Sequence, residues 1–327
     1  MQSKTNGPVP PEQNSAKKAA TPAAEKATPA DAEPTPPAEQ APVHGEAATP
    51  AVPTLGNVLE AAEELWPLSL AEAWDAVGLV TGRTGQPVRK VVFAVDPTLE
   101  VIDDAIAQEA DLLITHHPLL LRGVTQVAGT HFKGEAIHRL IESGTALLTA
   151  HTNADSAVGG VNDALADAFG LQDCVPLVQS PNGLPEEGLG RVGFLEKPMK
   201  LEAFAERVYT VLPAVAGGVR VAGDRLGVVR KVAICSGAGD SLFDAVRSHA
   251  ADVYVTADLR HHPASELREQ AGAGHPYLID VSHFASEWVW LSAAAKALGN
   301  VLHDDGFDID IQVSQVNSDP WDFVLTP

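Results

Sequence analysis

The sequence predicts an α/β fold made of two pseudo-symmetric halves, and three observations indicate it. The segment VRKV at 88–91 recurs at 229–232, and at the same offset DLLIT at 111–115 recurs as DVYVT at 252–256. Apolar runs of strand length alternate with helical patterns in both copies, which is typical of parallel strands joined by right-handed crossovers. In each copy a further apolar run ends in a histidine, three residues and a carboxylate. We therefore expect an internally duplicated fold with ligand residues at matching corners.

A separate N-terminal segment precedes the two halves. Residues 1–53 hold nearly half of the chain's 24 prolines, interleaved with Ala, Glu, Lys and Thr, and almost no large apolar side chain. Such a segment buries too little apolar surface to offset the entropy of ordering, so we predict a disordered Pro/Ala-rich tail. The rest of the chain divides into a first α/β half at 54–180 and a second at 181–327.

The first half begins with a helix and then alternates strands and helices. Apolar residues recur at helical spacing over 55–65, and Pro67 ends that helix. The β-branched run at 91–95 is typical of a strand buried on both faces. Gly170 suits the left-handed cap of the last helix. The elements that we expect next are a loop at 74–79, strands at 91–95, 112–115 and 146–150, and helices at 99–110, 133–143 and 156–169.

The second half repeats this alternation after a connection. Residues 176–190 are rich in Pro, Gly and Glu, which favours a linking segment between the halves. The alternating run at 308–313 indicates a half-exposed strand. The other expected elements are strands at 192–195, 218–222, 232–235, 253–256 and 277–281, and helices at 201–212, 241–250, 264–271 and 284–298.

Composition narrows the class of protein. The formal net charge of -21 disfavours a nucleic-acid binder, which needs clustered Lys and Arg to follow a phosphate backbone. Cys174 and Cys235 have no CxxC spacing, so they indicate neither a disulfide framework nor a thiolate zinc site. The chain shows no secretory signal and no apolar run long enough to cross a bilayer, so we expect a soluble cytoplasmic protein without a membrane partner.

Two adjacent histidines follow an expected strand. His116 and His117 come directly after the run at 112–115 and before Pro118. In open α/β sheets the loops past the carboxyl ends of strands bind ligands. Neighbours on a regular strand point to opposite faces, so a shared site requires that the strand has ended, which Pro118 favours. The alternative is a pair of hydrogen-bonded surface histidines.

The two His-x3-carboxylate motifs offer further ligands. His283 and Glu287 lie four residues apart at an expected helix start after Ser282, which places both side chains on one helix face. A solvent-exposed helix pair is the alternative, but the same spacing recurs in His151 and Asp155. Imidazole and carboxylate suit Zn, Fe, Mn or Ni, and carboxylates bridge paired ions.

Three other patterns carry less weight. His261 and His262 repeat the His-His-Pro signature, but four residues are inserted after the matching strand, so we expect them in a loop or first helical turn. The GxGxxG pattern at 188–193 precedes an expected strand, whereas a dinucleotide-binding loop links a strand to a helix, so we do not interpret it as a dinucleotide site. SGAGD at 236–240 lies between a strand and a helix, where either a phosphate loop or a tight structural turn fits.

Four segments, taken in order, resemble the Nif-three-like family, whose members include the GTP cyclohydrolase I type 2 homologues. They are WDAVGL at 74–79, DLLITHHP at 111–118, AHTNAD at 150–155 with GGVN at 159–162, and SHFASE at 282–287. The resemblance extends from residue 55 to the C-terminus. The chain lacks room for the domain that longer members insert between the halves, so it is similar to the short form.

The resemblance implies a Nif-three-like fold with a dinuclear metal site between the halves, and a homohexameric ring whose sites face an internal cavity. The ligands that it implies for two divalent ions are His116, His117, Asp155, His283 and Glu287. His151 is not a usual ligand in the family, so we keep it as a candidate acid–base or supporting residue.

Three functions are compatible with these residues. The first is a metal-dependent hydrolase of the GTP cyclohydrolase I type 2 kind, using a metal-bound water, with a purine nucleotide as substrate and His151 as proton shuttle. The second is a metal-dependent phosphoesterase acting on a phosphorylated small molecule. The third is a non-enzymatic metal-binding ring scaffold whose main partner is itself.

Overall fold

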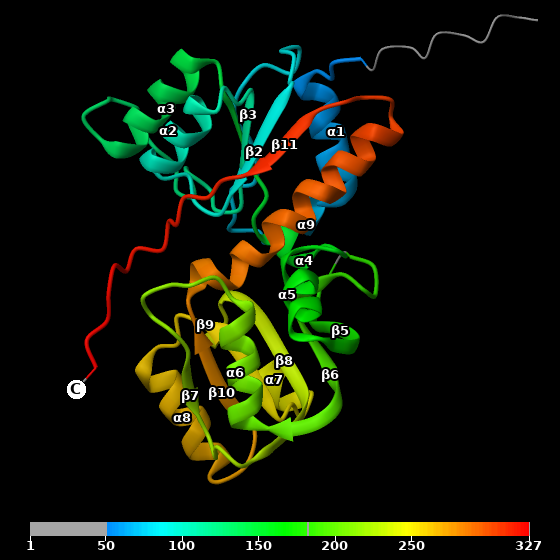
Figure 1. Ribbon diagram of the computed structural model, residues 1–327, viewed down its shortest axis with the longest axis vertical. Helices are drawn as coiled ribbons and strands as arrows, with labels where there is room; N and C mark the ends of the chain where they lie inside the picture. The colour runs from blue at the N-terminus through cyan, green and yellow to red at the C-terminus, as the bar shows by residue number, and fades with distance from the viewer. Residues whose placement is uncertain (1–50, 182, 327) are drawn as a thin grey trace, which may run out of the picture. The chain divides into compact units, whose positions relative to one another are not determined.

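The computed structural model describes residues 51–181 and 183–326 (Figure 1). The predicted tail at 1–53 lies almost wholly outside these described residues, and the predicted boundaries of the two halves stay a prediction. The described chain has a mixed α/β fold with two sheets. No helix in the described part is both long and apolar enough to span a membrane.

The first sheet has five strands in the order β1-β4-β3-β2-β11. Its middle strands β2, β3 and β4 run parallel, as the alternation predicts, and β1 is antiparallel to β4. The last strand of the chain, β11, lies parallel to β2 at the opposite edge. The bounds are β1 (Gly78–Thr81), β2 (Lys90–Ala94), β3 (Leu112–Thr115), β4 (Ala146–Thr149) and β11 (Asp310–Val313).

The second sheet has six strands in the order β5-β6-β8-β9-β10-β7. The strands β8, β9 and β10 are parallel, whereas β5, β6 and β7 join by antiparallel pairing. The bounds are β5 (Leu171–Gln179), β6 (Gly188–Lys200), β7 (Arg220–Ala222), β8 (Val228–Ala238), β9 (Val253–Ala257) and β10 (Tyr277–Val281).

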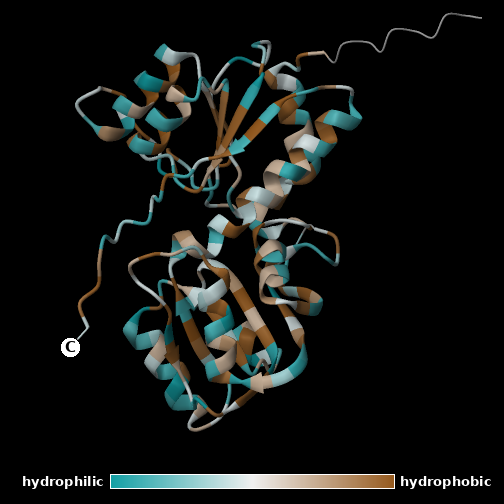
Figure 2. Cartoon of the chain, in the orientation of Figure 1, coloured by the Kyte–Doolittle hydropathy of each residue, from teal (hydrophilic) through white to brown (hydrophobic). Residues whose placement is uncertain are grey.

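Helices cover both faces of each sheet, so both sheets have apolar side chains buried on either side. In Figure 2 the strands are mainly brown, whereas the outer helix faces are mainly teal. The helices are α1 (Leu55–Leu65), α2 (Leu99–Ala107), α3 (Phe132–Ser143), α4 (Thr152–Ser156), α5 (Val161–Phe169), α6 (Leu201–Val211), α7 (Phe243–Ser248), α8 (His261–Ala271) and α9 (His283–Asp304).

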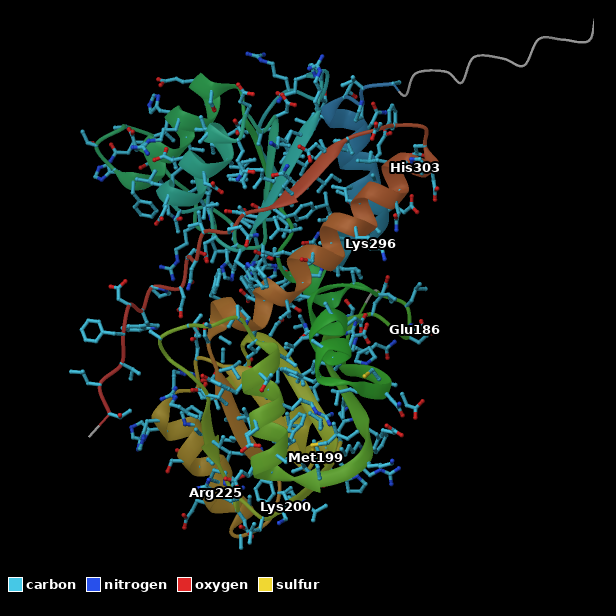
Figure 3. All side chains as sticks on the ribbon, in the orientation of Figure 1. Glu186, Met199, Lys200, Arg225, Lys296 and His303 are labelled. Atoms are coloured by element: carbon cyan, nitrogen blue, oxygen red, sulfur yellow. The ribbon has the colours of Figure 1, made fainter. Side chains whose placement is uncertain are left out.

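The helix α9 links the two sheets. It starts directly after β10 of the second sheet, and the chain then returns as β11 to the first sheet (Figure 1). Trp290 of α9 is fully buried and packs edge-on against Trp66 and Phe93, with ring centroids 5.2 and 6.4 Å away. The exposed Lys296 and His303 mark the later turns of α9 (Figure 3). The N-terminal turns of α9 are thus held close to both sheets.

Most predicted elements are present, and three predictions were wrong. The expected helix at 156–169 begins only at Val161, as α5, and residues 152–156 form the separate α4. Gly160 lies between them, where an added Cβ would come 1.9 Å from the Ala154 carbonyl oxygen. The expected link at 176–190 contains the end of β5 and the start of β6. The expected loop at 74–79 runs into β1, an edge strand of four residues.

Candidate metal centre

The paired histidines leave the first sheet together. The strand β3 ends at Thr115, as predicted, and the backbone N–H groups of His116 and His117 donate to the carbonyls of Ala94 and Val95 at the end of β2. The Thr115 hydroxyl donates to the His117 carbonyl at 2.9 Å and fixes the turn. Both imidazoles therefore point into one site, with ring centroids 5.0 Å apart.

The two His-x3-carboxylate motifs lie at helix starts. Ser282 caps α9, its hydroxyl accepting the N–H of Ala285 at 3.2 Å. His283 and Glu287 share one face of α9, and His283 Nε2 lies 3.0 Å from Glu287 Oε1. His151 is the residue just before α4, and Asp155 lies inside that helix.

Four imidazoles lie close together in the site. The rings of His116 and His117 lie 5.1 and 5.4 Å from that of His151, and the His117 and His283 rings are 5.1 Å apart. Ligand atoms within 4.8 Å of one another form two groups. The groups are His116, His117 and His151, and His117, His283 and Glu287. They share His117, so the atoms form two overlapping sets of metal-ligand type.

Each of these imidazoles is held by an oxygen at its Nδ1 atom. Three of the oxygens are carboxylates of the described chain, and the fourth is a backbone carbonyl. The pairs are His117 with Asp96 (2.7 Å), His283 with Asp258 (2.7 Å), His151 with Asp75 (2.8 Å) and His116 with the Ala150 carbonyl (2.9 Å). A proton on Nδ1 satisfies each acceptor and leaves the Nε2 lone pair facing the shared space. Metal-binding histidines are supported in this way.

Glu287 lies at the centre of the cluster. Its carboxylate oxygens lie 3.4 Å from His116 Nε2, 3.1 Å from His117 Nε2 and 3.0 Å from His283 Nε2. Asp155 is more peripheral, with its Oδ1 atom 3.8 Å from His116 Nε2. Burial raises the pKa of Asp155 despite the nearby imidazoles. The structure thus brings together all six residues that the sequence singles out.

The buried carboxylate requires positive charge beside it. Burial lowers the pKa of His117, but the charge of Glu287 and the hydrogen bond to Asp96 outweigh burial and raise the pKa to about 10. Burial acts likewise on His283, yet Glu287 and Asp258 raise its pKa to about 11. Burial raises the pKa of Glu287, but the imidazoles outweigh it and hold that pKa well below its usual range. Protons supply the positive charge on free imidazoles, and a divalent cation supplies it in a metal centre.

Two further observations fit a metal in this space. His116 Nε2 and Glu287 Oε2 are buried and make no hydrogen bond within the described chain, since the 3.1 Å approach of His117 to Glu287 is an ion contact outside hydrogen-bond geometry. Gly237 lies against the cluster, where an added Cβ would come within 2.6 Å of Glu287 Oε1 and 3.0 Å of His283 Nε2. Nitrogen and oxygen donors without partners, in a space kept free of side chains, suit Zn, Fe, Mn or Ni.

Sequence reasoning missed four residues that shape the cluster. Asp75, Asp96 and Asp258 hold the imidazoles, and Gly237 makes room for the ligands. Asp96 and Asp258 each follow a strand end, which was a usable signal. Asp75 lies in the WDAVGL segment, but nothing local relates it to a histidine 76 residues away.

Two other sequence patterns, the histidine pair at 261–262 and the SGAGD segment at 236–240, contribute no ligand atom to the cluster. His261 and His262 are exposed in the first turn of α8, as expected, and belong to neither group of ligand atoms. The segment at 236–240 ends β8 and enters a 3-10 turn. Its Gly237 has a φ of +60° and donates its N–H to Ser286 Oγ at 2.9 Å, so the tight structural turn describes it.

Comparisons with known proteins found similar sequences and a similar fold. The family model described as Duf34/NIF3 (NGG1p interacting factor 3) matches residues 53–320. A GTP cyclohydrolase 1 type 2 homolog of Streptomyces coelicolor is 49% identical, over 83% of this chain and 94% of that protein. A Bacillus cereus protein related to NIF3, known as a crystal structure, aligns with a TM-score of 0.77 and 26% identity, over 84% of this chain and 100% of its own.

Comparison with a longer relative indicates that this chain is of the short form, without an inserted domain. A GTP cyclohydrolase 1 type 2 homolog of Mycobacterium tuberculosis is 34% identical, over 82% of this chain and 96% of that protein. That alignment runs over 375 positions, more than the 327 residues of this chain, so the relative carries insertions that are absent here.

Proposed function

The chain belongs to the Duf34/NIF3 family, and from that premise we propose that it is a metal-dependent hydrolase with a dinuclear centre between two pseudo-symmetric halves. The observation that carries the proposal is the convergence of the Nε2 atoms of His116, His117 and His283 on buried Glu287, each imidazole being held at Nδ1 by an oxygen. The proposed ligands of the two ions are His116, His117, Asp155, His283 and Glu287.

The bound ions would supply a nucleophile and charge stabilisation, because coordination lowers the pKa of water to about 7 and a second cation stabilises developing negative charge. The protein residues do the rest. Glu287 lies within 3.4 Å of the Nε2 atoms of His116, His117 and His283 and would hold metal together with them. Asp96 and Asp258 accept the Nδ1 protons of His117 and His283, so Nε2 is the nitrogen of each ring that faces the metal site.

His151 is the proposed acid–base residue. Asp75 accepts from its Nδ1 at 2.8 Å, and this contact leaves Nε2 to accept or donate a proton beside His116 and His117. The Asp75 side chain is fully buried and also accepts from the backbone N–H and hydroxyl of Thr152, at 3.0 and 2.5 Å. His151 is therefore fixed in one orientation toward the centre.

We propose a purine nucleotide as the substrate, since the similar proteins of Streptomyces coelicolor and Mycobacterium tuberculosis are named GTP cyclohydrolase 1 type 2 homologs. The reaction would be hydrolytic opening of the guanine ring at C8, with His151 moving the proton. A phosphoesterase using the same ligands is the second candidate, and a non-enzymatic ring scaffold the third. The homohexameric ring and the cytoplasmic location are likewise proposals from the family.

The test begins with metal quantification of the native protein, followed by turnover of GTP with that metal restored. Formate release supports ring opening, whereas inorganic phosphate or a nucleoside supports the phosphoesterase. The Glu287→Ala variant serves as the metal-poor control. A metal-replete protein that turns over neither GTP nor a broad phosphoester panel would contradict the hydrolase and favour the scaffold.

A further inference from the structure

A cavity of about 830 Å³ opens beside the candidate metal centre. His117 and His283 line it, together with Arg220 of β7 and most of the residues at 318–324. Cavities of this size are typical of small-molecule sites. Residues 317–324, which we call the C-terminal segment, thus lie next to the candidate ligands although they follow the last strand of the chain (Figure 1).

The C-terminal segment is anchored to the backbone that presents the ligands. The Ser318 hydroxyl donates to Asp96 Oδ2 at 2.6 Å, and the other oxygen of Asp96 holds His117. The Asp319 carboxyl lies near the hydroxyl of Ser282, the residue that caps α9 just before His283. The segment is therefore hydrogen-bonded to the support of His117 and lies beside the start of α9.

Beyond these anchors the C-terminal segment offers two unpacked aromatic rings. Trp321 and Phe323 line the cavity but are 70% and 75% exposed, and the neighbouring Val324 is 58% exposed. Folded chains rarely leave adjacent large apolar side chains without a partner, and such patches mark binding sites. Exposed aromatic faces bind planar rings by stacking, whichever heteroaromatic base is involved.

An exposed guanidinium offers the cavity a place for an anionic group. Three of the four lining carboxylates are engaged within the protein, because Asp96 and Asp258 hold histidines and Asp280 pairs with Arg220, whereas Asp319 Oδ2 makes no hydrogen bond within the described chain. Arg220 is the one Lys or Arg among the lining residues of the described chain. Its side chain is 72% exposed, and the ion pair uses only one end of the guanidinium. The remaining N–H groups form a fork that suits phosphate or carboxylate.

We propose that the C-terminal segment recognises the ring of the substrate, with Trp321 and Phe323 stacking on a planar heteroaromatic ring and Arg220 binding the anionic group attached to it. The ligand class is a nucleotide or a related anionic heteroaromatic compound. A ligand ring bound there would lie beside His117 and His283, so the role of the C-terminal segment rests on the proposed function of the metal centre. No residue of the segment needs to bind metal or transfer a proton.

Calorimetric titration of the metal-replete protein with three probes tests the proposal. The probes are guanosine 5′-monophosphate, guanosine and ribose 5-phosphate, which carry ring and phosphate, ring alone, and phosphate alone. Trp321→Ala and Phe323→Ala should each weaken binding of the two ring-containing probes about tenfold, as loss of one stacking face does, and leave ribose 5-phosphate unchanged. Arg220→Gln should weaken the two phosphate-containing probes and leave guanosine unchanged.

Two matched variants sharpen the test. Trp321→Phe keeps an aromatic face and should bind within about threefold of the wild type. Tyr209→Ala removes an aromatic ring on α6 that is 66% exposed and does not line the cavity, so it should change nothing. Bound metal should match the wild type in every variant.

Several results would overturn the role of the C-terminal segment. They are guanosine binding that is unchanged in Trp321→Ala and Phe323→Ala, a wild type that binds no ring-containing probe, and loss of metal in these variants. A change of particle mass in light scattering would instead make the segment a contact between copies of the chain. In the first case an intact metal content and Glu287→Ala result would leave the proposed function standing, whereas a wild type that binds neither guanine-containing probe would also contradict the purine nucleotide as substrate.

Discussion

The two His-x3-carboxylate corners have the same spacing, yet their carboxylates lie in different surroundings. Glu287 is 3% exposed and lies within 3.4 Å of three imidazole nitrogens. Asp155 lies 3.8 Å from one imidazole nitrogen, and its Oδ1 accepts from the Ser236 hydroxyl at 3.2 Å. Spacing in the sequence brings a carboxylate to each corner, but it does not decide which one lies at the centre.

Side-chain length and helix continuity explain the difference. Glu287 has one more methylene than Asp155 and belongs to α9, which runs unbroken from His283 for 22 residues. The first-copy histidine, His151, precedes α4 with φ −108° and ψ −110°, and α4 has only five residues. In the first corner the histidine therefore precedes the helix that carries the carboxylate, whereas in the second corner both residues lie in one helix.

The largest expected effect is loss of metal on truncation of the central carboxylate. Glu287→Ala should lower metal affinity by more than about 100-fold, beyond the 10- to 100-fold typical of residues that only support a ligand. Asp155→Ala should lose less metal, because that carboxylate approaches a single imidazole. His116→Ala should behave like Glu287→Ala. All three should stay folded, since the buried apolar clusters that form the cores of the sheets do not include these residues. Metal analysis by mass spectrometry measures the difference.

A surface carboxylate serves as the control for these variants. Glu142→Ala removes a side chain on α3 that is 77% exposed, and its metal content should equal that of the wild type. Wild-type stoichiometry in Glu287→Ala and His116→Ala would show that the cluster is not the metal site. Equal losses in Glu287→Ala and Asp155→Ala would show that the two corners contribute alike.

The next effect concerns the space beside the second corner. Gly237→Ala places a methyl group 2.6 Å from Glu287 Oε1, at a φ of +60° that side chains rarely adopt. We expect a loss of about 1–3 kcal/mol in the free energy of unfolding, together with weaker metal binding. Gly144→Ala is the matched control, because it has a φ of +79° but nothing within 4 Å of the added Cβ. It should lose stability and keep its metal, as urea unfolding and metal analysis will show.

Local sequence patterns predict the features of the fold and the site that depend on neighbouring residues, and they miss those that depend on residues far apart in the chain. The strands β3 and β10 are fully buried, and their bounds agree with the apolar runs in the sequence. His116 and His117 follow directly after β3, where its apolar run ends. The edge strand β5 was missed because most of its residues are exposed and its register depends on β6. Local patterns thus predict buried elements and ligand types.

The supporting residues were hidden for a different reason. Asp75 belongs to a quoted motif, but its contact with His151 spans 76 residues and exists only in the folded chain. Gly237 was visible as part of a glycine-rich turn, while its closeness to Glu287 depends on the packing of β8 against α9. A sequence pattern therefore names the ligands more readily than the residues that orient them.

A smaller effect separates the two supporting carboxylates. Asp75 is fully buried and bonds His151 and Thr152, whereas Asp258 is 57% exposed and bonds His283. Asp75→Asn should lower the free energy of unfolding of the metal-free protein by about 2 kcal/mol, because a buried charged acceptor is lost. Asp258→Asn should lower it by no more than about 0.5 kcal/mol and instead weaken metal binding about tenfold. Urea denaturation followed by circular dichroism measures the first pair of values, and equal losses would contradict the difference in support.

The smallest effects come from the two serines that support the corners. Ser236 donates to Asp155 at 3.2 Å, a long bond that leaves no backbone group without a partner when it is removed, so Ser236→Ala should cost about 0.5 kcal/mol and little metal. Ser286 accepts the N–H of Gly237 at 2.9 Å and donates to the His283 carbonyl at 2.7 Å, so Ser286→Ala leaves a buried N–H unsatisfied and should cost about 1–2 kcal/mol. Chemical unfolding of the two single variants ranks them. The reverse order would mean that the first corner, with Asp155, is the more firmly held of the two.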